Sequence, residues 1–179
     1  VFGAGTTRTQ FIERMEAAQI ALLQDLWEGR QDDLPVATPY EAVILASVVE
    51  KETAHTDERS LVAGLFVGRL RRGMRLESDP TIIYGVSQGE PLYNRQGQRR
   101  TLYRSEIDRK TDWNTYQIDG LPKTPICNPG RGAIAAVLNP PETDYVFFVA
   151  DGKGGHLFAK TYAEHQRNVA AYRRFEREE

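Results

Sequence analysis

The feature that most constrains the fold is a run of apolar residues from Ala42 to Val49, interrupted only by Ser47. Thr38 and Pro39 precede this run and suit the start of a helix, and Glu41 suits the positive end of the helix dipole. A helix that is apolar on nearly every side has to be buried on most sides. The sequence therefore predicts one central helix, against which the rest of the chain packs.

Glu52, at the end of this predicted helix, continues its apolar stripe. Leu45, Val48 and Val49 precede it at spacings of three and four, which place all of these side chains on one face. Burial raises the pKa of a carboxyl group, and a shift of ~2 units (about 2.7 kcal/mol) keeps part of it protonated near neutral pH. A general acid that cleaves a glycosidic bond needs this property. Taken alone, periodicity favours the other interpretation, in which Glu52 caps the helix or pairs with a basic residue such as Arg59.

The order of the remaining segments predicts an α+β fold, with helices early in the chain and strands and loops later. The helix that carries Glu52 is expected to pack on a small antiparallel sheet and on irregular loops that form a cleft. Further helices are expected near residues 9–27, 56–72, 132–138 and 162–175. Strands are expected at Tyr145–Ala150 and His156–Ala159, joined by a glycine-rich hairpin. Extended, irregular or loop structure is expected for residues 74–85, 86–98 and 114–129.

Two domain-level expectations follow. Residues 1–39 are interpreted as an N-terminal helix and linker, the remnant of an upstream region, and residues 40–179 as the catalytic domain. The N-terminal helix is expected to pack against the main domain or to lead in from an upstream module.

Gly64 and Gly68, four residues apart on a predicted helix, allow another backbone to approach closely, and helix–helix packing is the expected reason.

Composition argues against several classes of function. The chain has 23 Lys and Arg against 25 Asp and Glu, a net charge of −2, so it has no basic field for nucleic acid. A single cysteine excludes an intrachain disulfide, and the three histidines form no recognisable zinc pattern, so neither metal nor cofactor is expected. No apolar run reaches the ~20 residues of a membrane span. Because the chain begins at Val1, an anchor or targeting segment could have been removed.

Several short blocks of sequence occur in one order between residues 40 and 172. The first is Ala46-Ser47-Val48-Val49-Glu50-Lys51-Glu52-Thr53-Ala54. The later blocks include Arg69-Leu70, Gly73-Met74-Arg75-Leu76, Ser78-Asp79-Pro80-Thr81, Gly120-Leu121-Pro122, Asn128-Pro129-Gly130 and residues 145–156. Together they resemble the MltG-type (YceG-like) endolytic murein transglycosylases. Two positions depart from that pattern: Gly68 stands where many members carry Asn, and Glu77 stands where others carry Gln.

The resemblance implies a peptidoglycan lytic transglycosylase with Glu52 as its catalytic residue. The enzyme would cleave the β-1,4 bond between N-acetylmuramic acid (MurNAc) and N-acetylglucosamine (GlcNAc), leaving 1,6-anhydro-MurNAc ends. Glu52 would act first as acid and then as base, unlike the usual pair of carboxylates in glycosidases. The substrate-binding candidates are Thr53, Ser78, Asp79, Tyr84, Asn114, Thr115, Tyr116, Asn128 and His156.

Each of these candidates also has a structural interpretation. Asp79 is either a second cleft carboxylate or the acid of an Asp-Pro turn. Tyr84 and Tyr116 either stack on sugars or are ordinary half-buried aromatic residues. The asparagines could recognise N-acetyl groups or simply form turns, and for His156 a structural role is favoured over substrate contact.

The resemblance further implies the setting of the enzyme. It implies a domain at the periplasmic face of the bacterial inner membrane, held there by a removed N-terminal anchor, beside peptidoglycan synthases whose nascent strands it terminates.

The first alternative to this function is a non-catalytic peptidoglycan-binding module, which would gain little from a buried acid. The second is a lyase that uses pyridoxal phosphate, but none of the five lysines has a convincing setting for a Schiff base.

Overall fold

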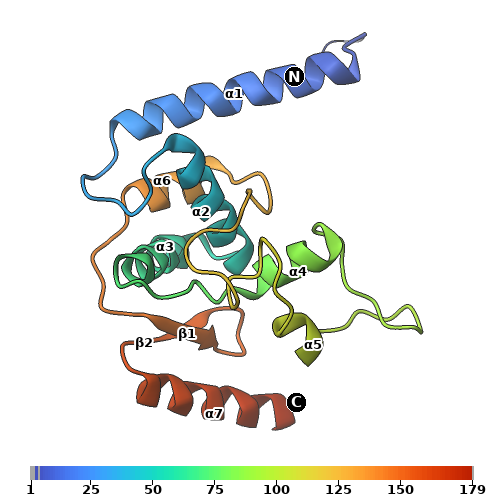
Figure 1. Ribbon diagram of the computed structural model, residues 1–179, viewed down its shortest axis with the longest axis vertical. Helices are drawn as coiled ribbons and strands as arrows, with labels where there is room; N and C mark the ends of the chain where they lie inside the picture. Colours follow the sequence, from blue (N-terminus) through green and yellow to red (C-terminus); the bar gives the residue numbers. More distant parts are fainter. Residues whose placement is uncertain (1–2, 4, 179) are drawn as a thin grey trace.

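The computed structural model describes residues 3 and 5–178, and it arranges them as a helical core above a two-stranded sheet (Figure 1). This arrangement confirms the predicted α+β class. In chain order, the elements are α1 (Arg8–Glu28), α2 (Pro39–Glu52), α3 (Thr56–Arg71), α4 (Asp79–Ser87), α5 (Arg104–Ile107), α6 (Arg131–Leu138), β1 (Phe147–Ala150), β2 (His156–Ala159) and α7 (Tyr162–Glu178).

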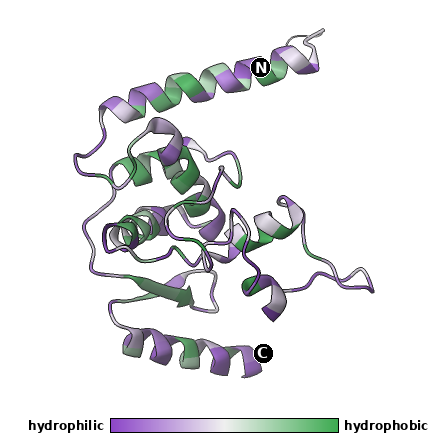
Figure 2. Ribbon diagram, in the orientation of Figure 1, coloured by the Kyte–Doolittle hydropathy of each residue, from purple (hydrophilic) through white to green (hydrophobic). Residues whose placement is uncertain are grey.

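The core forms where α2, α3 and α6 pack against one another. Hydrophobic side chains of all three helices meet there, and Figure 2 shows these helices as largely apolar (green). Ser47, the polar interruption of the apolar run, is fully buried, but its hydroxyl is satisfied. It donates to the carbonyl oxygen of Ile44 (2.7 Å) and accepts from the backbone N–H of Ile126 (2.9 Å). The predicted burial of this central helix on most sides is therefore confirmed.

The small sheet lies between the helical core and α7 (Figure 1). Strands β1 and β2 are antiparallel, with Phe147 opposite Ala159 and Ala150 opposite His156. Phe147 and Phe148 are adjacent, so their rings point to opposite faces of the sheet. Phe148 meets Phe66 of α3 edge-on at 6.0 Å, whereas Phe147 stacks on His165 of α7 at 5.2 Å. This pair of rings joins the sheet to both neighbouring layers.

The predicted hairpin between the strands is confirmed, and Asp151 closes it. The backbone N–H of Asp151 donates to the carbonyl oxygen of Gly155 (2.9 Å). Its Oδ1 accepts from the N–H groups of Lys153 (2.7 Å) and Gly155 (2.9 Å). Gly152 has a φ of +79°, a conformation that a residue with a side chain rarely adopts. The loop is therefore held by its own hydrogen bonds.

Helix α1 crosses the end of the domain and contacts it mainly through its C-terminal turns (Figure 1). Leu22, Leu26 and Trp27 pack against the core, while Met15 is 47% exposed and Ile20 is 57% exposed. The expected packing of this helix on the main domain thus applies to its last turns. In the described part of the chain, no helix combines the length and apolar character that crossing a bilayer requires.

The prediction of extended or irregular structure for residues 74–85 was wrong in its second half, because α4 begins at Asp79. Pro80 had suggested a turn. At the first turn of a helix, however, proline loses no hydrogen bond and its fixed φ suits the helix. Asp79 then lies at the positive end of the α4 dipole rather than in a loop. The short helix α5 was not predicted either.

The interpretation of Gly64 as a site of helix–helix packing was also wrong. A Cβ atom on Gly64 would lie 2.7 Å from the carbonyl oxygen of Pro141, which belongs to the loop after α6. At Gly68, one turn further along α3, a Cβ atom would lie 2.8 Å from the far end of the flexible Arg72 side chain and 4.0 Å from the carbonyl oxygen of Thr143, an ordinary contact. The close approach is therefore between a helix and a loop, and it occurs at Gly64.

We predict that Gly64→Ala lowers the free energy of unfolding by about 1–3 kcal/mol, because the loop backbone at Pro141 has to shift. Gly68→Ala is the matched control on the same helix. It should stay near wild type, because the guanidinium of Arg72 can swing away and alanine favours the helix by up to ~1 kcal/mol. Urea denaturation measures both variants. Equal destabilisation by the two substitutions would contradict the assignment of the close contact to Gly64.

Candidate active site

A cleft of about 650 Å³ opens where α2 ends and α4 begins, bordered by β1 and α7. Four residues singled out from the sequence line it: Glu52, Asp79, Tyr116 and His156. They come from four different parts of the chain, and the fold brings them to one place. Five aliphatic and aromatic side chains also line the cleft, together with Ala150 of β1, so the site offers both apolar surface and polar groups.

Glu52 is the last residue of α2, and its carboxyl group reaches the cleft. Burial raises the pKa of this carboxyl to about 7. The nearby hydroxyl of Ser78 acts in the opposite direction, and the negative charge of Asp79 raises the pKa further. Near neutral pH, therefore, the protonated and ionised forms of Glu52 are both well populated. This is the titration behaviour required of a group that first donates a proton and then accepts one.

Glu52 forms no salt bridge with any of the residues that the structure describes. Arg59, the partner that the structural interpretation favoured, lies instead beside Gly132 of α6. The cap position after α2 is occupied by Thr53. Neither structural alternative therefore accounts for Glu52.

Glu50, two residues earlier, faces a different part of the molecule. Its Oε2 accepts a hydrogen bond from the backbone N–H of Gly130 (3.3 Å), the N-terminal cap of α6. A carboxylate there is stabilised by the positive end of the α6 dipole. Glu50 thus has a structural role and serves as a natural control for Glu52.

Asp79 and Tyr116 form a hydrogen-bonded pair in the cleft. The phenol of Tyr116 donates to Oδ1 of Asp79 at 2.8 Å. Burial and the adjacent charge of Asp79 raise the pKa of Tyr116 far above its usual value, so the phenol keeps its proton. Asp79 is exposed and lies at the start of α4. The pair places an oriented carboxylate in the same cleft as the Glu52 carboxyl.

Ser78 and Thr115 support this pair from beneath, because both are almost fully buried. The backbone N–H of Ser78 donates to Oγ1 of Thr115 (3.0 Å), and the same oxygen bonds to Oγ1 of Thr81 (2.8 Å). These bonds tie the segment that carries Tyr116 to the first turn of α4. Neither Ser78 nor Thr115 lines the cleft.

Asn114 is also buried, and its side chain is fully used within the protein. Its Nδ2 donates to the carbonyl oxygens of Ile107 (3.0 Å) and Arg109 (2.7 Å), and its Oδ1 accepts from the N–H of Tyr116 (3.0 Å). With these partners, Asn114 holds the loop that positions Tyr116, and it does not face the cleft.

The structure places the remaining three candidates outside the cleft. Thr53 is 3% exposed, and its Oγ1 accepts from the N–H of His55 (3.0 Å). Tyr84 packs edge-on against Trp113 at 5.6 Å. Asn128 is exposed and lines a hollow beside α1.

His156 lines the cleft and is oriented by Glu58, a residue that the sequence analysis did not select. Oε2 of Glu58 lies 2.7 Å from Nδ1 of His156, and Oε1 accepts from its backbone N–H at 2.9 Å. Burial acts to raise the pKa of Glu58, but the hydrogen bonds from His156 hold it below its usual value. A carboxylate that binds both the ring and the backbone fixes the direction of the imidazole.

Arg69 and Glu77 are further cleft residues that the sequence analysis did not select. The guanidinium of Arg69, a 5% exposed residue, donates to the carbonyl oxygens of Arg75 (2.6 Å) and Val146 (2.7 Å) and to the carboxylate of Glu77. Glu77 had been noted as a departure from the family pattern, and it does lie in the cleft. Gly68, the other departure, lines a separate hollow beside Pro141. The Arg69-Leu70 block of the family resemblance was the available signal, but Val146, one of the partners of Arg69, comes from a distant segment.

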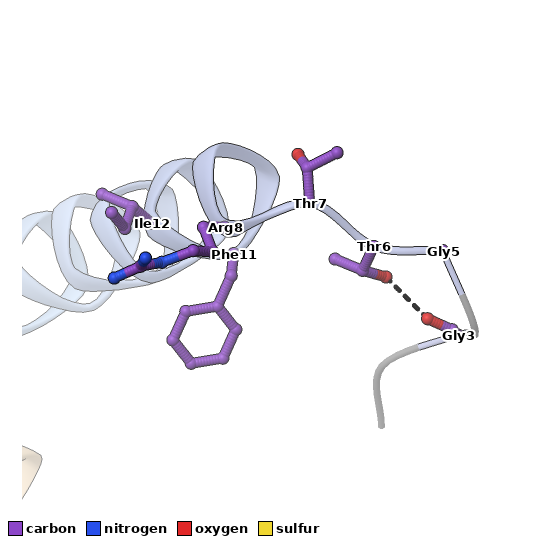
Figure 3. A pocket seen from close by; sticks show the side chains of 7 residues that line it. All are labelled: Gly3, Gly5, Thr6, Thr7, Arg8, Phe11 and Ile12. Atoms are coloured by element: carbon purple, nitrogen blue, oxygen red, sulfur yellow. Dashed lines mark hydrogen bonds between the residues drawn. The ribbon is translucent and has the colours of Figure 1, made fainter.

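A separate hollow of about 530 Å³ lies at the beginning of α1 (Figure 3). Its lining comes from α1 and the segment before it, where Oγ1 of Thr6 donates to the carbonyl oxygen of Gly3 (2.9 Å). It shares no lining residue with the Glu52 cleft. Within the described residues, no group of three or more His, Cys, Asp or Glu is arranged to hold a metal ion.

Comparisons with known proteins agree on one family. The sequence matches the model of the YceG-like family over residues 1–171. It is 34% identical over 134 residues to an endolytic murein transglycosylase of Bacillus subtilis (strain 168), covering 74% of this chain and 34% of the relative. It is 37% identical over 136 residues to an endolytic murein transglycosylase of Streptococcus pneumoniae (strain D39), covering 75% of this chain and 24% of the relative.

A solved structure shares the fold. The putative yceG-like protein lmo1499 from Listeria monocytogenes matches with a TM-score of 0.74 and 29% sequence identity, covering 93% of this chain and 51% of that one. The chain therefore spans about half the length of this structural relative. It spans about a third of the Bacillus relative and about a quarter of the Streptococcus relative.

We predict that Glu52→Gln stabilises the protein at alkaline pH. Because the pKa rises from 4.5 to about 7 on folding, the folded state binds the proton more tightly, and the free energy of unfolding of the wild type falls as pH rises through this range. Glutamine is neutral throughout, so at about pH 8 the variant should exceed wild type by on the order of 1–3 kcal/mol.

Urea denaturation at several pH values measures this difference, with Glu50→Gln as the control that lacks the effect. The gain from Glu52→Gln should shrink toward zero as the pH approaches 4.5. A gain that does not depend on pH would mean that the Glu52 carboxyl is not the group responsible.

Proposed function

The chain belongs to the YceG-like family, and from this premise we propose that it is the catalytic part of a peptidoglycan lytic transglycosylase. The bond cleaved is the β-1,4 linkage between MurNAc and GlcNAc within glycan strands. The observation that carries the proposal is the carboxyl of Glu52, half-buried in a 650 Å³ cleft with a pKa of about 7. The names of the relatives, endolytic murein transglycosylases, support the same reaction.

In the first step, protonated Glu52 donates its proton to the glycosidic oxygen. The bond between C1 of MurNAc and that oxygen breaks as positive oxocarbenium character develops at C1. The leaving GlcNAc keeps the proton as its new 4-hydroxyl group. A carboxyl whose pKa lies near the working pH is suited to this step, because a useful fraction carries the proton.

In the second step, the C6 hydroxyl of the same MurNAc attacks C1 and closes the 1,6-anhydro ring. Its proton passes to the carboxylate of Glu52, which restores the starting state. No water is consumed, and one carboxyl performs both transfers because the nucleophile belongs to the substrate. An internal nucleophile also has the advantage of proximity over an external water molecule.

Asp79 is the group we propose to stabilise the developing positive charge. Its carboxylate lies in the same cleft as Glu52 and acts on the Glu52 pKa through its charge. The phenol of Tyr116 holds it in one direction through a 2.8 Å hydrogen bond. The apolar side chains of β1, above all Phe147 and Phe148, provide surface for the faces of the sugar rings.

A non-catalytic peptidoglycan-binding module is the alternative. Such a module would gain nothing from holding Glu52 at a raised pKa, because burying an ionisable group costs stability above that pKa. The geometry therefore favours a catalytic role.

We also propose the cellular setting that family membership suggests. The substrate is the glycan strand of peptidoglycan, and the domain works at the periplasmic face of the inner membrane, anchored there by an N-terminal segment of the full-length protein. Peptidoglycan synthases are the proposed partners, and termination of their nascent strands is the proposed role. Fractionation of cells that make the full-length protein tests the location, and recovery in the cytosol would contradict it.

We predict that Glu52→Gln lowers the rate of release of anhydro-muropeptides from purified sacculi by roughly 10²–10⁴-fold, because it removes the acid and base in one change. Mass spectrometry of the released products measures the rate and identifies the chemistry. Glu50→Gln should remain close to wild type, since its carboxylate binds the α6 terminus. Reducing ends in place of anhydro ends would mean hydrolysis. An active Glu52→Gln variant would mean that another residue is the catalytic acid.

We predict that the activity of the wild type falls by about tenfold per pH unit above a pKa of about 7, as Glu52 loses its proton. Asp79→Asn removes a charge that raises the Glu52 pKa, so the alkaline limb of the pH–rate profile should move to lower pH. Asp144→Asn, at an exposed aspartate paired with Lys160, is the control and should leave the limb in place. An alkaline limb that stays at the same pH in Asp79→Asn would mean that the charge of Asp79 does not act on the pKa of Glu52.

A further inference from the structure

The cleft that contains Glu52 continues along α7. A second hollow, of about 640 Å³, runs beside this helix and shares His165, Val169 and Arg173 with the cleft. Its other lining residues include Tyr162, Gln166, Ala170, Arg174 and Arg177, which recur at spacings of three and four and so lie on one helix face. Because the same side chains border both hollows, they form one continuous surface that leads away from the catalytic acid.

The two ends of this surface carry opposite charge. Around Glu52 the cleft holds two further acids, Asp79 and the Arg69-paired Glu77, whereas the described lining of the α7 hollow has Arg173, Arg174 and Arg177 and no acid. Figure 2 shows α7 as largely hydrophilic, in contrast to the apolar strands above it. A ligand that fills the whole surface therefore has to present carboxylates at the α7 end.

The three arginines are available to bind such a ligand. None of them forms a salt bridge within the described part of the chain, although Nε of Arg177 donates to the backbone carbonyl oxygen of Arg173 (2.9 Å). Arg69, also in the cleft, differs because its guanidinium is fully engaged by Glu77 and two carbonyl oxygens. A guanidinium presents a planar fork of donors that matches a carboxylate, so arginines that have no salt bridge among the described residues and share one helix face suit an anionic ligand.

An exposed tyrosine lines the α7 hollow at the start of the helix. Tyr162 is 62% exposed and lies 6.0 Å from the ring of Phe147, which belongs to the cleft. His165 stacks on the same Phe147 ring. Apolar surface thus passes from Phe147 in the proposed sugar site to His165 and Val169 of α7, and Arg173 follows one turn after Val169.

We infer that the α7 face formed by Arg173, Arg174 and Arg177 binds the stem peptide of the strand held in the cleft, through the peptide carboxylates. This inference rests on the proposed function. The stem peptide is attached to the lactyl group of MurNAc, the sugar whose C1 and C6 react beside Glu52, so it leaves the strand at the reacting residue. It is an anionic extension of an otherwise nearly neutral glycan, which matches the change in charge along the surface. The protein then prefers strands that still carry their peptides.

The test compares glycan strands that carry stem peptides with strands from which an amidase has removed them. Binding is measured in a Glu52→Gln background, so that the strands are not cut. Adding Arg174→Gln and Arg177→Gln should raise the Kd for peptide-bearing strands by at least about tenfold, because each substitution removes a donor of charge-assisted hydrogen bonds. The Kd for stripped strands, which keep a lactyl carboxylate on each MurNAc, should change by less than about twofold.

The control carries Arg8→Gln and Arg14→Gln on α1, at the opposite end of the molecule from α7, with the same change in net charge (Figure 1). It should bind both kinds of strand as the unsubstituted background does. Equal weakening on both strands by the α7 variant, weakening by the control, or no effect of the α7 variant would each overturn the inference. Loss of binding to phosphatidylglycerol vesicles with strand affinity unchanged would assign the face to the membrane and overturn it too.

Activity on the same two substrates separates this inference from the proposed function. With Glu52 restored, the wild type should release anhydro ends faster from peptide-bearing strands, and the α7 variant should lose that preference through KM while keeping kcat. If the wild type releases no anhydro ends from either substrate, the proposed reaction fails. The difference in Kd between the two strands would still establish the peptide site.

Discussion

The burial of one carboxyl group at the end of an apolar helix is the interaction on which the rest of this structure depends. Helix α2 is enclosed by α3 and α6 along the stretch that leads to Glu52, so core packing fixes the position of the end of the helix. The desolvation that follows from this position is the largest cause of the raised pKa of Glu52. The packing of the core therefore also determines the pKa of the proposed catalytic group.

The second half of the site is built on a different principle. Asp79 and Tyr116 lie in the cleft because a buried set of hydroxyl and amide groups, Ser78, Thr115 and Asn114, ties their two segments together. These buried residues make no contact with the cleft themselves. The hydrogen bonds of the Ser78 backbone N–H, the Thr115 hydroxyl and the Asn114 side chain are directional, so they hold the loop in one arrangement. Each cleft residue directly follows a support residue in the sequence: Asp79 follows Ser78, and Tyr116 follows Thr115.

Sequence patterns predicted the elements that carry clear local signals and failed where a signal had two meanings. Apolar stripes predicted α1 and α7, the apolar run predicted α2, terminal charges marked the ends of α3, and the glycine-rich turn predicted the hairpin; α6 also lies where a helix was expected. The start of α4 did not, since proline marks either a turn or a first helical turn, and only the burial of Thr81 and Ile82 decides between them. Likewise, Thr53, Asn114 and Thr115 belong to motifs near the site, but which way a side chain points depends on contacts with distant segments. The partners of His156 and Arg69 are such long-range contacts, and no spacing in the sequence encodes them.

Arg69 gives the cleft a fixed width. Its single guanidinium holds the irregular segment that leads to α4, through Arg75 and Glu77, and the entry to β1, through Val146. Both segments border the cleft, through Glu77 and Phe147, so moving them apart would break several charge-assisted bonds of one nearly inaccessible side chain at the same time. These bonds oppose widening of the cleft, so its width is largely set when the chain folds.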